Sequence, residues 1–329
     1  TTANLPATLG ADAPYENMGT IQTKGWELAI DYRHTFKNGL HFGVTASVAD
    51  DKTEVTKWTY NTKIPSYGAT GWWDKSAYKE GMVLGDIWGL QFDRFLTEDD
   101  FNADGSLKAG LPDQTKVFPA GYQFAPGDVL YKDLDNNGEI VKQTNTNDKG
   151  DLSVIGNALP RLQFGLNLDA AWKGFDISMF FQGVAKRKLW AAGNQVLPGF
   201  TTGEPFYKGA EDYWTPENTD AFYPRPMDYK QSASGNYSVN DRYLLNMAYL
   251  RLKTFTVGYS LPKVWLSKFK VQGLRVYFTG ENLFTIDGVK PAIDPEIGIR
   301  TASGKSDQRN FGRSYPYQKT VSFGIQLSL

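Results

Sequence analysis

The residues best suited to chemistry lie in an acidic stretch with a glycine, YKDLDNNGEI, at positions 131–140. Its oxygen-bearing side chains fall at positions 1, 3, 5 and 7 of an EF-hand-like loop: Asp133, Asp135, Asn137 and Glu139. Gly138 supplies a bend, so these oxygens could surround a hard cation. Position 12 is Thr144 instead of a bidentate Glu, so the stretch is not an EF-hand. We predict a structural Ca²⁺ site, with Mg²⁺ or a metal-free Asp/Asn/Gly turn as the alternatives.

Tryptophans outside the predicted strands are the second set of candidates. Flat aromatic rings can stack on sugars and on peptides, so they could line a substrate path or contact a partner. Packing within loops is the alternative for each of them. The candidates are Trp58, Trp72, Trp73, Trp190 and Trp214.

Covalent catalysis finds little support in the composition. The chain has no cysteine, which excludes catalytic thiols, disulfides and Cys-ligated zinc. His34 and His41 are its only histidines, too few for a multi-histidine metal site. Acid pairs such as Asp99 and Asp100 could serve a glycosidase, but the acids are scattered among loops. We expect no enzyme, and the net charge of −1 gives no basic field for nucleic acid.

The elements that position these residues are strands with a period of two. In the stretch 161–182, apolar residues at Leu162, Phe164 and onward to Trp172 alternate with polar or small ones. Lys173 and Gly174 form a tight turn, after which the alternation resumes from Phe175 to Phe181. Each strand is long enough to cross a bilayer while tilted. Further alternating strands are predicted at about 20–33, 40–49, 243–261, 274–279 and 319–329.

The connections alternate between short and long, with long external loops at about 50–160, 184–241 and 284–317. Outer-membrane β-barrels have short periplasmic turns and long outer loops, whereas a soluble β-sandwich has no reason to sort them. We therefore predict an all-β, antiparallel transmembrane barrel portion of about seven strands. Trp26 and Trp172 are expected in the aromatic girdles. The run from Met82 to Phe95 is expected in the first external loop, outside the wall.

Seven strands leave two open edges, which lipid does not tolerate. The sequence also opens at Thr1 without a signal peptide. The chain is therefore expected to be one portion of a barrel, with the remaining strands elsewhere.

Five stretches resemble one family, the SusC/RagA-like TonB-dependent outer-membrane transporters, in its C-terminal part. In chain order they are IQTKGWELAIDY, YKDLDNNGEI with the following DLSVIGNALPRLQFGLNLDAAWKGFDISMFFQG, YLRLKTFTVGYSLPK, LRVYFTGENLFTI with IDPE, and SYPYQKTVSFGIQLSL. They match the family's Asn-Lys-Gly-x-Glu strand opening, Asp/Asn/Gly loop with Lys-Gly-Phe-Asp hairpin, Tyr-Leu-Arg-Leu-Lys strand, Asn-Leu-Phe stretch with Asp-Pro-Glu, and closing strand. Together they cover the chain from about Asn17 to its end.

The resemblance implies a barrel of about 22 strands with an N-terminal plug, in the outer membrane. It implies import of oligosaccharides or peptides with a SusD-like surface lipoprotein, driven by the TonB complex. The plug and the TonB box have no counterpart in this sequence. The resemblance also adds Asp151, which matches a later family Asp, to the predicted metal ligands.

The expected role is thus wall and vestibule of a nutrient importer across residues 1–329, with outer-membrane lipid and the rest of the barrel as neighbours. Strand charges such as Arg251, Lys253 and Arg275 are expected on the lumenal side. A soluble β-sandwich that binds carbohydrate is the alternative, and the substrate cannot be read from the loops.

Overall fold

The computed structural model describes residues 17, 19–58, 79–142, 149–191, 193–200, 206–227, 235–269, 271–290, 293–296 and 317–329. Seven antiparallel strands form one sheet, here called the wall, in the order β1-β2-β7-β8-β11-β12-β13. The wall strands are β1 (Gly19–Thr35), β2 (His41–Trp58), β7 (Arg161–Trp172), β8 (Phe175–Lys186), β11 (Tyr249–Ser260), β12 (Gly273–Asp287) and β13 (Thr320–Ser328). Each wall strand pairs with the wall strand before it in the chain, as the predicted meander requires.

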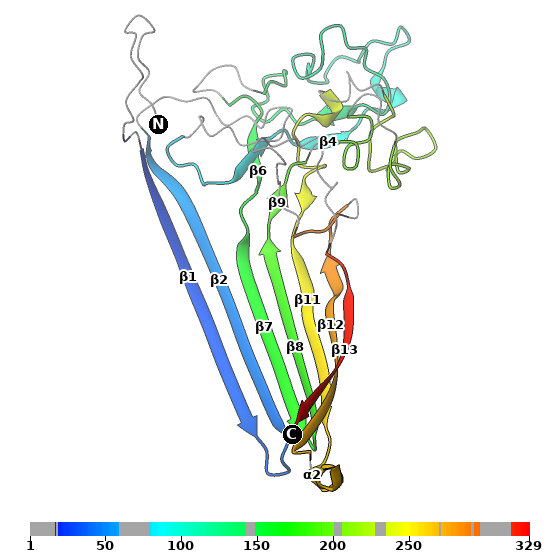
Figure 1. Cartoon of the computed structure of the whole chain (residues 1–329). Coiled ribbons are helices and arrows are strands. Elements are labelled where there is room, and N and C mark those ends of the chain that lie inside the picture. Colours follow the sequence, from blue (N-terminus) through cyan, green and yellow to red (C-terminus); the bar gives the residue numbers. More distant parts are fainter. Residues whose placement is uncertain are drawn as a thin grey trace, which may run out of the picture.

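The short connections meet at one end of the wall and the long ones at the other (Figure 1). Lys173 and Gly174 both have positive φ, 48° and 88°, which is the geometry of a tight hairpin turn between β7 and β8. The connection from β11 to β12 carries the short helix α2 (Lys263–Leu266) and the 3₁₀ turn η4 (Ser267–Phe269). The predicted sorting of connections is therefore present. Among the described residues, no helix is both long enough and apolar enough to cross a membrane.

One face of the wall carries a row of apolar side chains without a protein cover. On β1, Trp26, Leu28, Ile30 and Tyr32 are each between 51% and 55% exposed. On β13, Phe323 is 82% exposed. A soluble sandwich would cover this face with a second sheet, but the described part of the chain leaves it open. The exposed rows thus fit the expected lipid face of a barrel strand.

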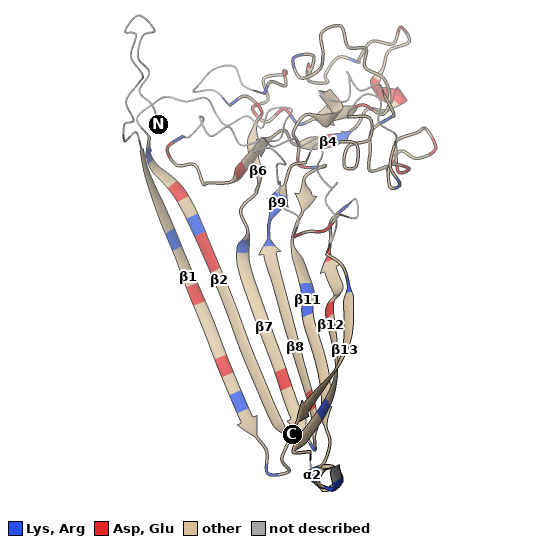
Figure 2. Ribbon diagram, viewed as in Figure 1, with Lys and Arg blue, Asp and Glu red and all other residues tan. Residues whose placement is uncertain are grey.

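The outer limit of this apolar face lies near Trp26. Trp26 pairs with Asp50 across β1 and β2, and Asp50 binds Arg161 at the start of β7, with Arg161 Nη2 2.6 Å from Asp50 Oδ2. The charged residues of β2 all lie from Asp50 onward, away from the turns (Figure 2). Above this level β1 and β2 continue as a polar ribbon, in which the hydroxyls of Thr23 and Thr53 are 2.9 Å apart.

One residue near the start of β7 departs from regular backbone geometry. Arg161 pairs with Lys186 and Gln163 with Val184, so the register of β7 with β8 is the same on both sides of Leu162. Leu162 itself has a left-handed φ of 53°, and its backbone N–H donates to Asp50 Oδ1 at 3.1 Å. The predicted strand from Leu162 to Trp172 thus agrees with the extent of β7.

The connections from β2 to β7 and from β8 to β11 fold together beyond the end of the wall. Their described parts, here called the external loop domain, contain three two-stranded sheets (Figure 1). These sheets pair β3 (Asp86–Gly89) with β6 (Ser153–Asn157), β4 (Phe92–Phe95) with β5 (Val129–Tyr131), and β9 (Lys188–Leu189) with β10 (Leu245–Asn246). Two 3₁₀ turns, η2 (Glu98–Asp100) and η3 (Gly235–Tyr237), complete it. As predicted, the run 82–95 lies outside the wall.

The external loop domain has its own apolar core in two clusters. One gathers around Trp190, Leu197, Tyr243 and Met247, and the other around Phe95, Tyr131, Ile140 and Trp214. Since most of the buried apolar residues lie here, this domain is a packed body.

Candidate functional site

The acidic loop brings three of the five predicted metal ligands together. Carboxylate oxygens of Asp133, Asp135 and Asp151 lie within 4.8 Å of one another. The loop follows β5 and turns at Asn136 and Gly138, which have φ of 57° and 83°. Asp151 lies 16 residues after Asp135 in the sequence and is fully buried. The turn thus positions two carboxylates beside a third from a separate segment.

Backbone amides already bind these carboxylates. Gly138 N donates to Asp133 Oδ2 at 2.8 Å, and the amides of Leu134 and Val141 donate to Asp151, each at 2.8 Å. Burial would raise the pKa of Asp133, but the backbone donors outweigh it and lower that pKa. The pKa of Asp135 is raised, by desolvation first and then by the neighbouring carboxylates. A cation would relieve the repulsion that raises it.

Of the other two predicted ligands, Asn137 bonds to the cluster as a donor, with its Nδ2 3.0 Å from Asp135 Oδ2, and Glu139 binds elsewhere. Glu139 forms an ion pair with Lys116, which raises the pKa of that lysine. The Oδ1 atom of Asn137 accepts a hydrogen bond from the amide of Glu139 at 2.7 Å. A Ca²⁺ ion takes six to eight oxygen ligands, so water or backbone carbonyls would have to complete the shell. Three converging carboxylates fit such an ion, and the structural Ca²⁺ site stays a prediction.

The tryptophan candidates lie in different surroundings. Trp190 and Trp214 are 1% and 7% exposed, each within one of the two core clusters, which accords with the packing alternative. Trp58 ends β2 with its ring against Gly19. Trp72 and Trp73 lie outside the described residues.

The polar face of the wall is crossed by an ion pair near the turn end. Arg275 of β12 reaches over β11 to Asp176 of β8, with Nε 3.0 Å from Oδ1. Gly258 of β11 lies between them, and a Cβ there would come within 2.7 Å of the guanidinium atoms. The absence of a side chain at Gly258 therefore opens the path for Arg275.

A second ion cluster joins the wall to the third long connection. It comprises Arg251 and Lys253 of β11 with Asp294 and Glu296, and is here called the wall–loop charge cluster. Arg251 Nη2 is 2.7 Å from Asp294 Oδ1, and Lys253 Nζ is 2.6 Å from Glu296 Oε2. A register shift between Leu252 and Thr254 marks a bulge at Lys253.

The wall–loop charge cluster is buried and also binds the far end of the same connection. The side chains of Arg251 and Asp294 are only 4% and 5% exposed. Tyr317 donates its backbone N–H to Asp294 at 3.2 Å, and its ring lies 4.7 Å from Lys253 Nζ. Burial would raise the pKa of Asp294, but its bonds to Arg251 and to backbone amides lower it. The cluster thus brings both ends of the third connection to the wall.

Sequence reasoning placed Arg251 and Lys253 on the lumenal side but gave them no partners. Their partners, Asp294 and Glu296, lie in the IDPE stretch, which was noted only for its resemblance to the family. The matching spacing of two residues between the bases and between the acids could have suggested the pairing.

A third ion pair holds the external loop domain together. Asp128, fully buried, accepts from Arg225 Nε at 2.8 Å, from the hydroxyl of Tyr122 at 2.8 Å and from Asn236 Nδ2 at 3.0 Å. Burial would lower the pKa of Arg225, but the bonds to Asp128 raise it. Asp128 belongs to the first long connection and Arg225 to the second, so this pair joins them.

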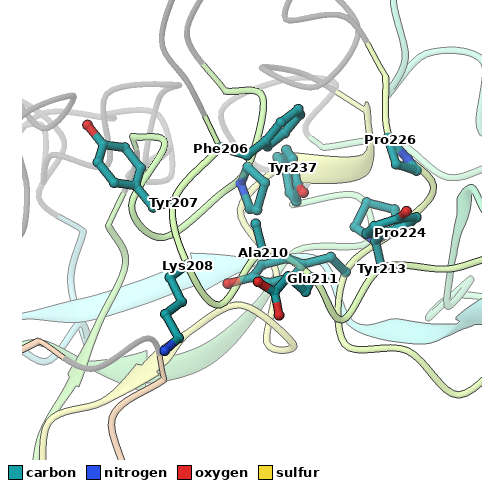
Figure 3. A pocket seen from close by; sticks show the side chains of 11 residues that line it. Phe206, Tyr207, Lys208, Ala210, Glu211, Tyr213, Pro224, Pro226 and Tyr237 are labelled. Atoms are coloured by element: carbon teal, nitrogen blue, oxygen red, sulfur yellow. The ribbon is translucent and has the colours of Figure 1, made fainter.

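A pocket of about 680 Å³ opens in the second connection (Figure 3). Its lining is mainly aromatic rings and prolines, including Phe206, Tyr213, Tyr237, Pro224 and Pro226. These residues were not predicted from the sequence, because tyrosines and prolines in a long loop show no periodicity. Its volume is within the usual range of small-ligand sites.

Comparison with known proteins gives homologues along nearly the whole chain. TonB-dependent receptor P3 of Formosa agariphila is 26% identical over 335 residues, which cover 98% of this chain and 30% of the receptor. TonB-dependent receptor SusC of Bacteroides thetaiotaomicron is 22% identical over 322 residues, covering 95% of this chain and 27% of SusC. No family model matches the chain. The chain spans about a third of the length of the curated relatives it matches.

The solved structures agree on the fold. The RagAB peptide transporter aligns with a TM-score of 0.63 at 18% identity, covering 99% of this chain and 31% of the other. The RagAB peptide importer in the open-open state gives the same TM-score at 17% identity, covering 100% and 31%. The expected antiparallel barrel portion is confirmed.

Proposed function

We propose that this chain, a homologue of SusC-like TonB-dependent receptors along nearly its whole length, serves nutrient import across the outer membrane. The relatives place it in an outer-membrane β-barrel and are receptors and transporters, not enzymes. In the proposed role the chain forms part of the barrel wall and of the external vestibule. It performs no covalent chemistry.

The observation that carries the proposal is the difference between the two faces of the wall. Aromatic and aliphatic side chains point outward from Trp26 to Tyr32, as lipid contact requires. The opposite face carries ion pairs such as Arg275 with Asp176, as a water-filled lumen allows. A wall with one apolar and one ion-paired face is suited to a solute path along the ion-paired face.

The partners follow from the open edges and from the relatives. Strands β1 and β13 each pair with one wall strand only in the described structure, so further strands would close the barrel. A plug inside that barrel is inferred from the relatives alone. A SusD-like lipoprotein would cover the external loop domain, and the TonB complex would supply energy through segments other than these strands. The cargo would be oligosaccharides or peptides.

The experiment is an uptake assay in the source bacterium. Deletion of the gene for the complete polypeptide that carries this sequence should abolish uptake of at least one labelled pool, maltooligosaccharides or mixed tripeptides. A plasmid copy should restore it, and restoration should disappear when the proton gradient is collapsed. The polypeptide should fractionate with the outer membrane and need detergent for extraction. Unchanged uptake of both pools, or extraction into buffer alone, would refute the proposal.

A further inference from the structure

The pocket in the second connection has a fixed floor. Tyr223 and Tyr237 are 4% and 5% exposed and belong to the apolar core. The ring of Tyr237 meets that of Tyr243 edge to face at 5.2 Å, and the Tyr223 hydroxyl donates to Val196 O at 3.0 Å. The backbone of Tyr223 pairs with Trp214 and with Asp212. The floor is therefore part of the packed external loop domain and is formed before any ligand arrives.

The mouth of the pocket presents aromatic surface that the described protein leaves uncovered. Phe206 is 58% and Tyr213 is 41% exposed, although both are large rings. Figure 3 shows Phe206 next to Tyr237, with Tyr213 and Pro224 on the other side of the opening. Apolar rings facing one another across an opening can enclose a ligand group between them.

The lining favours an apolar group over a sugar. Sugar hydroxyls that lose water need hydrogen-bond partners, and each unpaired one is costly. Ring faces and prolines, which make up most of the lining, offer none, and the Tyr223 hydroxyl is already bound within the core. The polar groups that remain are the hydroxyls of Tyr207, Tyr213 and Tyr237 and the charged ends of Lys208 and Glu211. A bulky apolar side chain, by contrast, gains from each ring it covers.

The charged residues of the lining fit the rest of a peptide. Lys208 and Glu211 are exposed and of opposite charge. A short peptide carries an ammonium group at one end and a carboxylate at the other, so it can meet both charges while its side chain enters the pocket. A neutral sugar chain has no such charges.

We infer that this pocket is a binding subsite for a bulky apolar side chain of a short peptide. The inference rests on the proposed import function and narrows its cargo. The subsite selects peptides by side chain in the external vestibule.

The test is equilibrium binding by calorimetry, with the complete polypeptide purified in detergent. The probes are Ala-Phe-Ala, Ala-Ala-Ala and maltotriose. Ala-Phe-Ala should bind at least about tenfold more tightly than Ala-Ala-Ala, since burial of one phenyl ring is worth that much. The variants Phe206→Ala and Tyr213→Ala should each remove most of this preference.

The matched control is Phe36→Ala, which removes another exposed phenylalanine (47%, against 58% for Phe206) in the turn between β1 and β2. It should leave the preference unchanged. Equal affinity for the two peptides, or a preference that survives both pocket variants, overturns the inference. So does maltotriose binding that these variants abolish. The pocket variants could also lose a co-purifying lipoprotein while they still bind peptides. That result would show that the pocket contacts a partner protein, and it would also overturn the inference of a peptide subsite.

The outcomes separate the subsite from the import function. If the gene deletion abolishes uptake but the pocket variants bind peptides normally, the subsite fails and import stands. If the deletion leaves all uptake intact, the import proposal fails, while the peptide preference still tests the pocket directly.

Discussion

Replacing Arg251 by Met should release the third long connection from the wall. Arg251 Nη2 binds Asp294 at 2.7 Å and its Nε binds Thr285 Oγ1 at 2.7 Å, in a site where the arginine is 3% exposed. Methionine keeps much of the apolar stem but leaves the carboxylate of Asp294 buried with no guanidinium.

The magnitude follows from the burial. Removing one partner of a buried, hydrogen-bonded charge pair costs about 3–5 kcal/mol. Lys253 stays beside Glu296 and limits the damage, so the lower value applies here. A cost of about 3 kcal/mol makes undocking more frequent by on the order of a hundredfold. Global unfolding should change less, because the strand pairs of β11 with β8 and β12 are retained.

Amide hydrogen exchange read by mass spectrometry is the assay, with the complete polypeptide in detergent. Peptides that cover residues 287–296 and 317–320 should exchange on the order of a hundredfold faster in Arg251→Met. The control is Arg275→Met, which breaks the ion pair with Asp176 on the same lumenal face but far from this connection. It should leave these peptides unchanged.

Unchanged exchange in Arg251→Met would refute the idea that the wall–loop charge cluster docks the connection. A double-mutant cycle gives a second check. Asp294→Asn alone should accelerate exchange, and adding it to Arg251→Met should accelerate it little further, because both changes remove one interaction. Fully additive effects would show that the two residues act separately.

Three further predictions concern other sites. Saturating Ca²⁺ should raise the Tm of the complete polypeptide by a few degrees relative to the protein in a chelator. Binding at a hundredfold excess over Kd stabilises the folded state by about 2–3 kcal/mol. The variant Asp133→Asn should remove that rise. Gly258→Leu should displace the Arg275 guanidinium and lower stability by about 1 kcal/mol, the upper range for a partly exposed pair. Arg94 Nη1 donates to Asp100 Oδ2 at 2.6 Å, and this hydrogen bond is the main reason why the pKa of Asp100 is lowered to about 2. Because the folded pKa lies below the ordinary 3.8, the pair contributes about 2 kcal/mol above pH 4, and this is lost as pH falls from 4 towards 2.

Each of these has a result that would contradict it. A Ca²⁺-dependent Tm that survives Asp133→Asn would place the ion elsewhere. In the Gly258→Leu background, Arg275→Met should have no further effect on Tm, and an undiminished effect would show that the ion pair had survived. Protection of the backbone around Thr97 should differ between the wild type and Asp100→Asn at pH 7 and converge only as pH falls to about 2. A constant difference would exclude titration of Asp100 as the cause.

The wall was predictable from the sequence because its information is local. Alternation with a period of two, the Lys173-Gly174 turn and the sorting of connections each depend on neighbouring residues. Alternation does not, however, predict the backbone conformation of a single residue. Leu162 is apolar and fits the alternation, yet its φ is left-handed.

The external loop domain could not be derived in the same way. Asp128 and Arg225 are 97 residues apart, and nothing in their neighbours specifies that they meet. The acidic loop was found from spacing, whereas Asp151 entered only through the resemblance to a family. The residues of the aromatic pocket were missed, because a tyrosine that packs in a loop core and one that faces an opening have the same local sequence signal.

The Asp50–Arg161 ion pair at the level of Trp26 sets how deep the chain sits in the bilayer. Sinking the wall by one pair of residues would carry these charges towards the hydrocarbon, where a charged side chain costs about 0–1 kcal/mol near the interface and more with each further step inward. Raising it would expose the apolar row from Trp26 to Tyr32 to water. The vertical position is therefore confined from both directions. The height of the external loop domain above the lipid is then fixed as well, so the lipoprotein that we propose as a partner would meet this domain at a constant distance from the membrane surface.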